Sequence, residues 1–460
     1  MRILMCNSFH YVRGGAERCF LDLMALMREQ GHDVIPFSMQ HERNLPSDYA
    51  SYFISNIDYP SLMQNGKSIR ARLKATERIL YSREAAGKID LLIRETRPDI
   101  AHVHGIAHET SPSILPVLKR HGIPVVQTLH DYKLLCPNTS FVSNGQICER
   151  CKGGRFYNAT RYRCKRGSLP ASLIATLEAY AHKFSRIYEH NVDCFISPSK
   201  FLARKVAEFG VTGKVVTIPN FIDVASFTPG YAPEPYYVFA GRLVDVKGVR
   251  TLVRAAEMVT KGRLFIAGSG DLKEELETYV ADRGLDHVTF LGHLATGKLI
   301  ELLRHAAFTV TPSEWYENYP MSVLESLACG TPAVAADIGG IPEIVRDGVT
   351  GLTFPPGDVK ALAKRIAYLL DNPEESIRMG RAGRCQVEQI NSAESHYVAT
   401  MAVYGQLCAS RPGTAEPDKA ISQFEGSARR LNACAARVPE IAAKGELENL
   451  RCVEDGRSEA

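Results

Sequence analysis

The chain has 460 residues, of which 45% are hydrophobic and 23% are charged, and its formal net charge is +4. This length exceeds what one hydrophobic core usually organises, so two or three domains are expected. The composition is typical of a folded globular protein, and so small a net charge does not by itself indicate a nucleic-acid partner. No apolar run approaches the roughly 20 residues of a membrane-spanning helix.

The first residues predict a buried strand rather than an export signal. The opening "MRILMCNSF" has only a short apolar core and no small-residue cleavage pattern. The twelve cysteines are numerous, but without an export signal they favour thiols or metal ligands over disulfides. We therefore expect a cytoplasmic protein.

Short apolar segments alternate with stretches of helical periodicity along most of the chain. Strands separated by helices indicate parallel, doubly wound α/β sheets. Each half begins with a strand, a glycine turn and a helix, which predicts two Rossmann-like domains facing each other across a cleft. The expected strands are 2–6, 32–38, 99–105, 123–130 and 193–199 in the first half, and 236–241, 263–270, 288–292, 307–313 and 331–337 in the second.

Changes in composition predict the domain boundaries. A stretch rich in proline and aromatic residues separates the two halves, and the last fifty residues have few large apolar side chains. The predicted order is a first domain over 1–215 with a cysteine-bearing insertion at 134–166, a linker over 216–235, a second domain over 236–385, a helix over 386–408 that packs back across the domains, and a disordered tail over 409–460.

Two turns of the second half carry residues suited to a diphosphate. In open parallel sheets, ligands bind at the carboxyl ends of the strands. Arg242 and Lys247 follow one strand in "GRLVDVKG", and Gly268 follows the next in "GSGDL", where it permits close backbone approach. An arginine fork and a lysine point charge together fit a diphosphate. Two solvated surface cations are the simpler alternative.

A short helix is predicted over 321–329, because a proline precedes it and a Gly-Thr-Pro sequence ends it. The backbone amides of Met321 and Ser322 at its start form a natural anion site. Glu317 lies in the loop before this helix, and Glu325 lies one turn inside it. Carboxylates recognise vicinal hydroxyls of ribose or hexose well. A diphosphate between two polyols is a nucleotide-sugar, which is our hypothesis for the ligand.

This ordered set of motifs resembles the retaining glycosyltransferases of family 4, which have the GT-B fold. The two glutamates are followed by "LACGTPAVAADIGGIPEIVRDGVTGLTF" and accompanied by "GRLVDVKG", "IAGSGDL", "FLGHL", "IPNFID" and "GGAER". The likeness covers roughly residues 1–405. It implies a hexosyltransferase that uses a nucleotide-sugar donor and a glycan or lipid-linked acceptor, with retention of configuration, in exopolysaccharide, capsule or lipopolysaccharide synthesis.

The resemblance also implies residue roles. Arg242 and Lys247 resemble the pair that neutralises the donor diphosphate, Glu325 the ribose-binding glutamate, and Glu317 the glutamate near the transferred sugar. Gly14 and Gly15 resemble the loop that covers the donor phosphates, and His130 in "TLHDY" resembles the active-site histidine. A satisfied core histidine is the alternative for His130. Asn318 and Tyr319 depart from the usual Gly-Phe, which bears on the choice of donor sugar.

No cofactor is expected for catalysis. The chain lacks a pair of aspartates separated by one residue, the usual anchor for a metal-bound donor diphosphate. The charge of the leaving group must then be stabilised by the two cations and a helix end.

The insertion contains four cysteines, Cys136, Cys148, Cys151 and Cys164. Four thiolates can hold one structural zinc, although the spacing is not that of a standard finger. A redox pair at Cys148 and Cys151, or four unligated thiols, are the alternatives. The insertion resembles one found in some family members that produce surface polysaccharides. Its place next to His130 predicts that it shapes the acceptor side of the cleft.

Basic residues surround these cysteines, and others occur in "GKSIRARLKATERILYSR" (66–83). They predict peripheral contact with anionic lipid at the inner face of a membrane, which suits a lipid-linked acceptor; solvated helix faces are the simpler alternative. Two rival functions stay open. A nucleotide-sugar epimerase has the same fold and needs no acceptor. A zinc module on nucleic acid fits the basic rim, but the donor motifs argue against it, so no nucleic-acid partner is expected.

Overall fold

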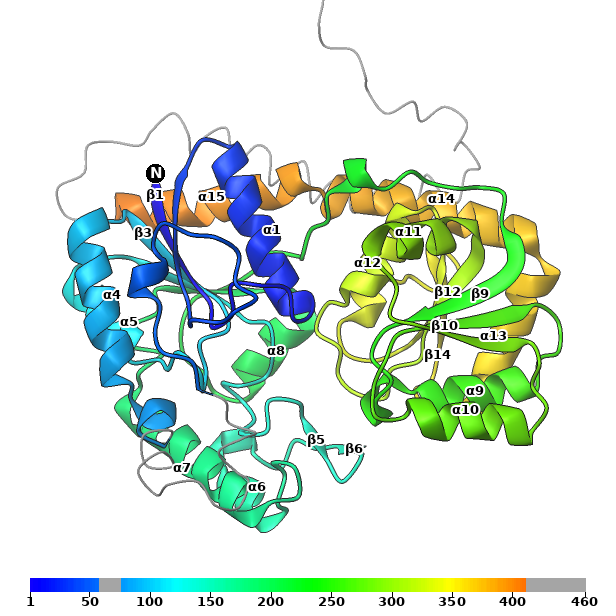
Figure 1. The fold of residues 1–460 in the computed structure, drawn as a ribbon, viewed down its shortest axis with the longest axis horizontal. Coiled ribbons are helices and arrows are strands. Elements are labelled where there is room, and N and C mark those ends of the chain that lie inside the picture. Colours follow the sequence, from blue (N-terminus) through cyan, green and yellow to red (C-terminus); the bar gives the residue numbers. More distant parts are fainter. Residues whose placement is uncertain (58–75, 411–460) are drawn as a thin grey trace, which may run out of the picture.

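The computed structural model describes residues 1–57 and 76–410, which form two α/β domains (Figure 1). Each domain contains a parallel sheet of six strands with helices packed around it. The predicted fold class is therefore confirmed. The predicted tail lies outside the described residues except for 409 and 410, as does most of the basic segment 66–83.

The sheet of the first domain has the strand order β2-β1-β3-β4-β7-β8. Its first strand is buried from Ile3 to Cys6, because a parallel sheet covered on both faces needs a continuous apolar run. The strands are β1 (Arg2–Cys6), β2 (Asp33–Phe37), β3 (Ile100–Val103), β4 (Val125–Thr128), β7 (Cys194–Ser197) and β8 (Val215–Thr217). The helices around this sheet are α1 (Gly15–Glu29), α4 (Arg83–Thr96), α5 (Ile114–Arg120) and α8 (Lys200–Glu208).

The cysteine-bearing insertion and the segment after it leave the sheet between β4 and β7. They form a two-stranded antiparallel hairpin and two helices at the end of the first domain that is remote from the C-terminal helix α15 (Ala393–Ala409) (Figure 1). Their elements are β5 (Val142–Ser143), β6 (Gln146–Ile147), α6 (Tyr157–Arg161) and α7 (Leu169–Ser185).

The sheet of the second domain has the order β11-β10-β9-β12-β13-β14. Its helix α12 (Met321–Ala328) agrees with the short helix predicted there, and its apolar residues are buried. The strands are β9 (Glu234–Ala240), β10 (Arg263–Ala267), β11 (Val288–Gly292), β12 (Ala306–Thr311), β13 (Ala333–Ala336) and β14 (Gly351–Phe354). The other helices are α9 (Val249–Glu257), α10 (Lys273–Asp282), α11 (Thr296–His305) and α13 (Val359–Asp371).

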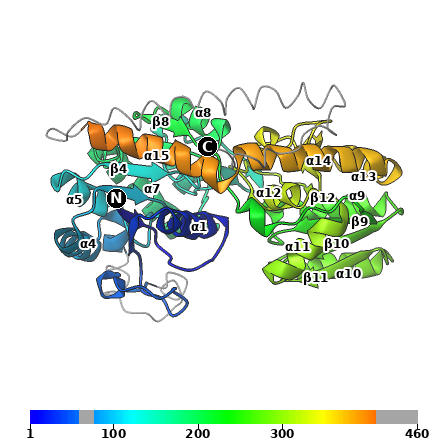
Figure 2. The same cartoon turned by 90° about the horizontal axis from the view of Figure 1, so that it is seen from above.

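Two C-terminal helices connect the domains. Helix α14 (Pro373–Ile390) packs on the second domain, and α15 (Ala393–Ala409) returns over the first (Figure 2). The prediction of one helix over 386–408 misses a break, because Ser392 caps a new helix by accepting the Ser395 N–H at 3.2 Å.

This break lies beside the predicted linker, so the chain crosses between the domains twice at one place. The Ile222 N–H donates to the Asn391 carbonyl at 2.9 Å. The Asn391 side chain donates to the Asn220 carbonyl at 2.8 Å, and His396 Nδ1 contacts the Pro219 carbonyl at 2.8 Å. Two paired crossings restrain how the domains move relative to each other.

Four strands of the described residues went unpredicted: the hairpin strands β5 and β6, and the strands β8 and β14 at the edges of the two six-stranded sheets. β5, β6 and β8 have only two or three residues, too few to show a period. Across the described residues, no helix is both long and apolar enough to span a bilayer.

Candidate functional site

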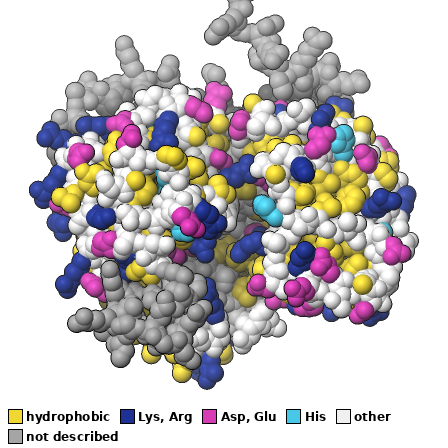
Figure 3. Space-filling model, viewed as in Figure 1, with side chains coloured by type: hydrophobic (Ala, Val, Ile, Leu, Met, Phe, Trp, Pro, Cys, Tyr) yellow, Lys and Arg dark blue, Asp and Glu magenta, His cyan; other side chains and the backbone are white. Residues whose placement is uncertain are grey.

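A pocket of about 340 Å³ lies between the domains and contains residues of both. The space-filling view shows a hollow between the two lobes with Lys and Arg side chains at its rim (Figure 3). We call it the cleft pocket; its lining is Val12, Gly14, Gly15, Arg18, Ala240, Gly241, Arg242, Ala267, Gly268, Ser269, His293, Leu294, Leu299, Met321, Ser322 and Glu325. An adjoining hollow of about 440 Å³ shares six of these residues. Together the two have the size of a small-molecule site.

Seven of the eight predicted donor-binding residues line the cleft pocket; Lys247 is the exception. Gly268 shows why the sequence needs glycine there. Its φ is +154°, and a Cβ at this position would collide with the carbonyl oxygen of Gly241. The backbone turns after β9 and β10 therefore lie against each other at the pocket wall, which only a residue without a side chain permits.

The first domain closes one side of the cleft pocket with its glycine loop. A Cβ built on Gly15 would lie 3.6 Å from Met321 Cγ of the second domain. The thiol of Cys19, one turn into α1, lies 3.5 Å from the Met321 sulfur. The N-termini of α1 and α12 thus meet at the pocket, so backbone amides from both domains are available to an anionic ligand.

Glu325 forms an ion pair with Arg18 across the cleft. The carboxylate is 9% exposed, and burial raises its pKa above the usual value, although the Arg18 charge opposes that shift. Sequence analysis did not select Arg18, even though it belongs to the "GGAER" motif. Because Arg18 and Glu325 both line the cleft pocket, a ligand that uses the carboxylate must compete with the guanidinium.

Glu317 is held by three donors of its own domain. Its Oε1 accepts from Lys247 Nζ at 2.6 Å, from the Ser313 hydroxyl at 2.7 Å and from Trp315 Nε1 at 2.8 Å. Trp315 is the sole tryptophan of the chain, and its ring also lies 5.7 Å from Lys247 Nζ. Lys247 therefore contacts the carboxylate rather than the pocket wall.

The electrostatics keep Glu317 ionised. Burial raises the pKa of this carboxyl, but the charge of Lys247 and the hydrogen bonds from Lys247, Ser313 and Trp315 outweigh burial. The pKa of Glu317 is therefore below its usual value.

The glycines that follow Glu317 in the sequence have a packing role. The Gly340 N–H donates to the Glu317 carbonyl at 2.8 Å, and a Cβ on Gly340 would collide with the Asn318 carbonyl.

His130 lies after β4, on the first-domain side, and pairs with a second histidine. Its Nε2 is 2.8 Å from His104 Nδ1, and the two rings stack at 5.1 Å. Burial, with a smaller effect from His396, lowers the pKa of His130 to about 4. At neutral pH His130 is therefore uncharged, and one of the two rings donates to the other.

The loops that carry His130 and Glu317 are tied together across the cleft. The Asn318 amide donates to the Leu129 carbonyl at 2.9 Å, and Asn318 Oδ1 accepts from the Ser199 hydroxyl at 2.8 Å. The Tyr132 hydroxyl donates to the Tyr316 carbonyl at 3.0 Å. We expected Asn318 to bear on the choice of donor sugar; in the structure its side chain joins the two domains. The sequence could not reveal this, because the partners are more than a hundred residues away.

The four cysteines of the insertion lie in one neighbourhood. Burial raises the pKa of Cys151 to about 12, and the other three thiols add to this shift. In the described part of the chain, however, no three His, Cys, Asp or Glu side chains are placed to hold a metal ion. As positioned, the thiols do not form a ligand set, so the zinc interpretation stays a prediction that metal analysis of the purified protein decides.

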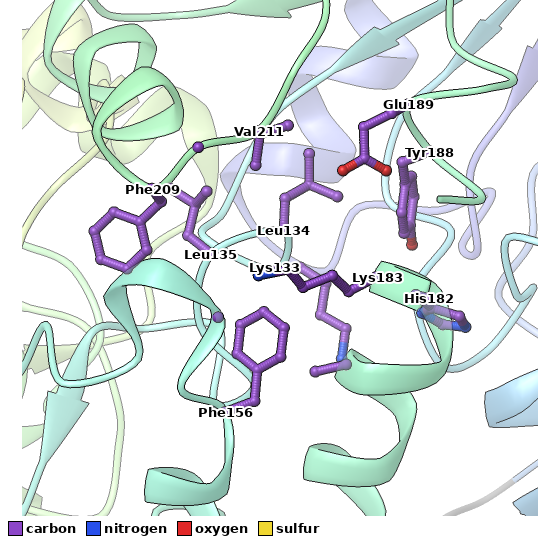
Figure 4. A pocket seen from close by; sticks show the side chains of 13 residues that line it. Lys133, Leu134, Leu135, Phe156, His182, Lys183, Tyr188, Glu189, Phe209 and Val211 are labelled. Carbon is purple, nitrogen blue, oxygen red and sulfur yellow. The ribbon is translucent and has the colours of Figure 1, made fainter. Parts of the chain in front are cut away.

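A second cavity, of about 60 Å³, lies in the first domain behind the insertion (Figure 4). Its lining combines apolar side chains, among them Leu134, Phe156 and Phe209, with polar and charged ones, among them Lys133 and Glu189. It is several times smaller than a sugar-nucleotide site requires. We interpret it as a packing defect between the insertion and the domain.

Comparisons with known proteins agree with this geometry. The profile described as "Glycosyltransferase Family 4" matches residues 13–226, and that described as "Glycosyl transferases group 1" matches residues 227–386. The glycogen synthase of Mycobacterium tuberculosis H37Rv is 27% identical over 442 residues, which cover 91% of this chain and 97% of that protein. The alpha-D-kanosaminyltransferase of Streptomyces kanamyceticus is 33% identical over 155 residues, 33% of this chain and 40% of that protein.

Solved structures share the fold. Sucrose-phosphate synthase from Thermosynechococcus elongatus has a TM-score of 0.65 at 21% identity and covers 89% of this chain and 100% of its own. Anabaena HepE in complex with UDP-glucose has a TM-score of 0.61 at 17% identity, covering 88% of this chain and 100% of its own. These relatives give no support to an epimerase. With two GT-B domains and glycosyltransferase profiles over both of them, the chain is a glycosyltransferase of the GT-B type.

Proposed function

We propose that this glycosyltransferase moves a hexose from a nucleoside-diphosphate sugar to a hydroxyl of a glycan or lipid-linked acceptor, with retention of configuration, in the synthesis of a surface polysaccharide. One observation carries the donor assignment. The cleft pocket combines Arg242, the N-termini of α1 and α12, and the carboxylate of Glu325. Cationic and amide donors fit the diphosphate, and the carboxylate fits the ribose hydroxyls. The complex of HepE with UDP-glucose makes uridine the first base to test.

In the proposed reaction the bond between the anomeric carbon and the diphosphate breaks, and a bond from that carbon to the acceptor oxygen forms. The departing phosphate oxygen takes the proton of the acceptor hydroxyl. Arg242, Lys247 and the amides of Met321 and Ser322 stabilise the charge that develops on the diphosphate. For Lys247 this requires turning its ammonium from Glu317 toward the donor when the donor binds.

Retention follows if the acceptor attacks from the face that the nucleotide leaves. A double displacement would need a nucleophilic carboxylate, and Glu317 is a poor one. Its Oε1 already accepts three hydrogen bonds, one of them from the Lys247 ammonium, and its lowered pKa marks a weakly basic group. We assign Glu317 to the hydroxyls of the transferred sugar. His130, uncharged at neutral pH, orients the sugar or the acceptor instead of delivering a proton.

The test is product analysis with defined substrates. The protein is incubated with UDP-, GDP- and ADP-hexoses and with a short soluble glycan or a lipid-linked sugar, and the anomeric configuration of the product is determined by NMR. The proposal predicts an α-linked product from an α-configured donor. A β-linked product would contradict retention. Conversion of the donor sugar without any acceptor would replace this proposal with the epimerase.

A further inference from the structure

The helix α7 exposes its leucines and buries most of its polar residues. Its outward residues are Leu169, Leu173, Leu177, Tyr180 and Phe184, which we call the α7 stripe. At 3.6 residues per turn, these positions fall within an arc of about 80° and form one continuous line along the helix. Three of the leucine side chains are 46–54% exposed, and Phe184 is 81% exposed.

The buried face of α7 is the reverse of what a surface helix usually presents. It consists of Ser172, Ala175, Thr176, Glu178 and His182. Glu178 is fully buried and accepts from Lys133 Nζ at 2.6 Å. A surface helix normally turns its apolar stripe to the core. An exposed apolar line on a helix whose polar face is fixed inside marks an interaction surface.

The surroundings of the α7 stripe are strongly cationic. Residues 149–189 contain nine Lys and Arg residues and three carboxylates, of which Glu178 is buried and Glu149 contacts Tyr316 and Lys205. Two aromatic residues lie among them: Tyr157 on α6 is 51% exposed, and Tyr180 stacks on Phe184 at 5.8 Å. The basic side chains are Arg150, Lys152, Arg155, Arg161, Arg163, Lys165, Arg166, Lys183 and Arg186.

We propose that this face of the first domain docks on an anionic lipid bilayer. The α7 stripe would enter the boundary between headgroups and acyl chains, and the basic residues would contact lipid phosphates. Apolar side chains bordered by cations and interfacial tyrosines fit that boundary. A second copy of the chain fits worse, because a symmetric contact would bring one cationic face against another.

Docking here would also deliver an acceptor to the cleft. The insertion touches the second domain beside Glu317, because Tyr316 donates its hydroxyl to Glu149 at 2.9 Å. Lys205 of the first domain holds the same carboxylate at 2.8 Å. The delivery of an acceptor rests on the proposed function, which includes a lipid-linked acceptor. The binding of the α7 stripe to lipid does not depend on that proposed function.

The experiment is vesicle sedimentation without any donor or acceptor sugar. The full chain is mixed with vesicles of phosphatidylcholine alone, or with 30% phosphatidylglycerol, at about 0.1 M salt. We expect at least tenfold stronger partitioning to the anionic vesicles, and at least a tenfold loss in the triple variant Leu173→Ser/Leu177→Ser/Phe184→Ser. Leu91→Ser is the matched control, because Leu91 is an exposed leucine on α4, and it should bind like the parent.

Two further measurements keep the outcomes separate. Leu177→Trp should be quenched by brominated lipid, and Leu91→Trp should not. Transfer to a water-soluble acceptor should survive in the triple variant, so loss of lipid binding is distinguished from loss of the proposed enzyme activity. Equal binding by the parent and the triple variant, or no binding by the parent, would overturn the proposal. So would a dimer, measured by light scattering, that the triple variant alone abolishes.

Discussion

The two walls of the cleft are built in different ways. The second-domain wall consists of short segments that directly follow β9, β10 and β12, so Arg242, Gly268 and Glu317 sit in compact motifs. The first-domain wall has one compact motif, the glycine loop with Gly14 and Gly15, but the rest of it depends on distant partners: His130 pairs with His104, and Leu129 is held by Asn318. Chemistry that lies in one turn is visible in a sequence, whereas chemistry assembled from separate elements is not.

The largest effect is expected from the second-domain wall. Lys247→Ala should lower kcat about 10²- to 10³-fold, because it removes a charge that stabilises the departing diphosphate and leaves the buried Glu317 without its cation. Steady-state kinetics with saturating donor measures this. Lys261→Ala is the control, since Lys261 forms an exposed ion pair with Asp371 in the same domain. A Lys247→Ala enzyme with near-normal kcat would rule out the assigned role.

Substitution of Glu325 should affect mainly nucleotide binding, and substitution of Glu317 should affect mainly turnover. Glu325→Ala should weaken nucleotide affinity about tenfold, equivalent to about 1.4 kcal/mol, with most of kcat retained at saturation. Glu317→Ala should lower kcat about 100-fold with nucleotide affinity nearly unchanged. Calorimetric titration of the nucleotide, paired with kinetics, tests both. If the two variants showed the same profile, the division between ribose and transferred sugar would be wrong.

A smaller effect on kcat is expected from Asn318, whose side chain joins the two walls of the cleft. Asn318→Ala removes two hydrogen bonds between the domains, each worth about 1 kcal/mol, and lets the His130 and Glu317 loops separate. We expect a three- to tenfold fall in kcat with nucleotide affinity unchanged. Asn372→Ala is the matched control, because the Asn372 side chain donates to the Tyr368 carbonyl within the second domain, at the end of α13. An unchanged kcat for Asn318→Ala would show that this link does not position the site.

These residues show which parts of the fold and of the site can be predicted from the sequence. The doubly wound domains were predictable from apolar runs such as 2–6, and α12 from its flanking proline and glycine. Arg18 was missed because a charged residue in the first turn of a helix has no local sign of a partner 307 residues away. The break before α15 was missed because it consists of only Asn391 and Ser392, without the glycine or proline that usually ends a helix.

The smallest effect concerns three buried histidines, of which His102 and His130 belong to the first domain and His396 to α15. Burial lowers the pKa of His102 to about 3 and those of His130 and His396 to about 4. Below pH 6.5 these histidines therefore bind protons in the unfolded chain but not in the folded chain. Their contribution makes the free energy of unfolding fall as the pH falls from about 6.5 to 4, and it is constant above that range. His396→Asn should flatten the slope of the melting temperature, and the exposed His190→Asn should not. A melting temperature independent of pH in this window would contradict these environments.

The most direct measurement of the donor site is a thermal-shift comparison of the parent chain and Glu325→Ala with UDP, GDP, ADP and their sugar conjugates. A ligand at 100 times its Kd stabilises the folded state by about 2.7 kcal/mol, which is a shift of several degrees. We predict that one nucleotide family raises the melting temperature of the parent. Glu325→Ala should lose about half of this shift, because a tenfold weaker affinity leaves about 1.4 kcal/mol of stabilisation at the same ligand concentration. A well-folded parent that responds to no nucleotide, or a variant that responds equally, would contradict the assignment of the cleft pocket.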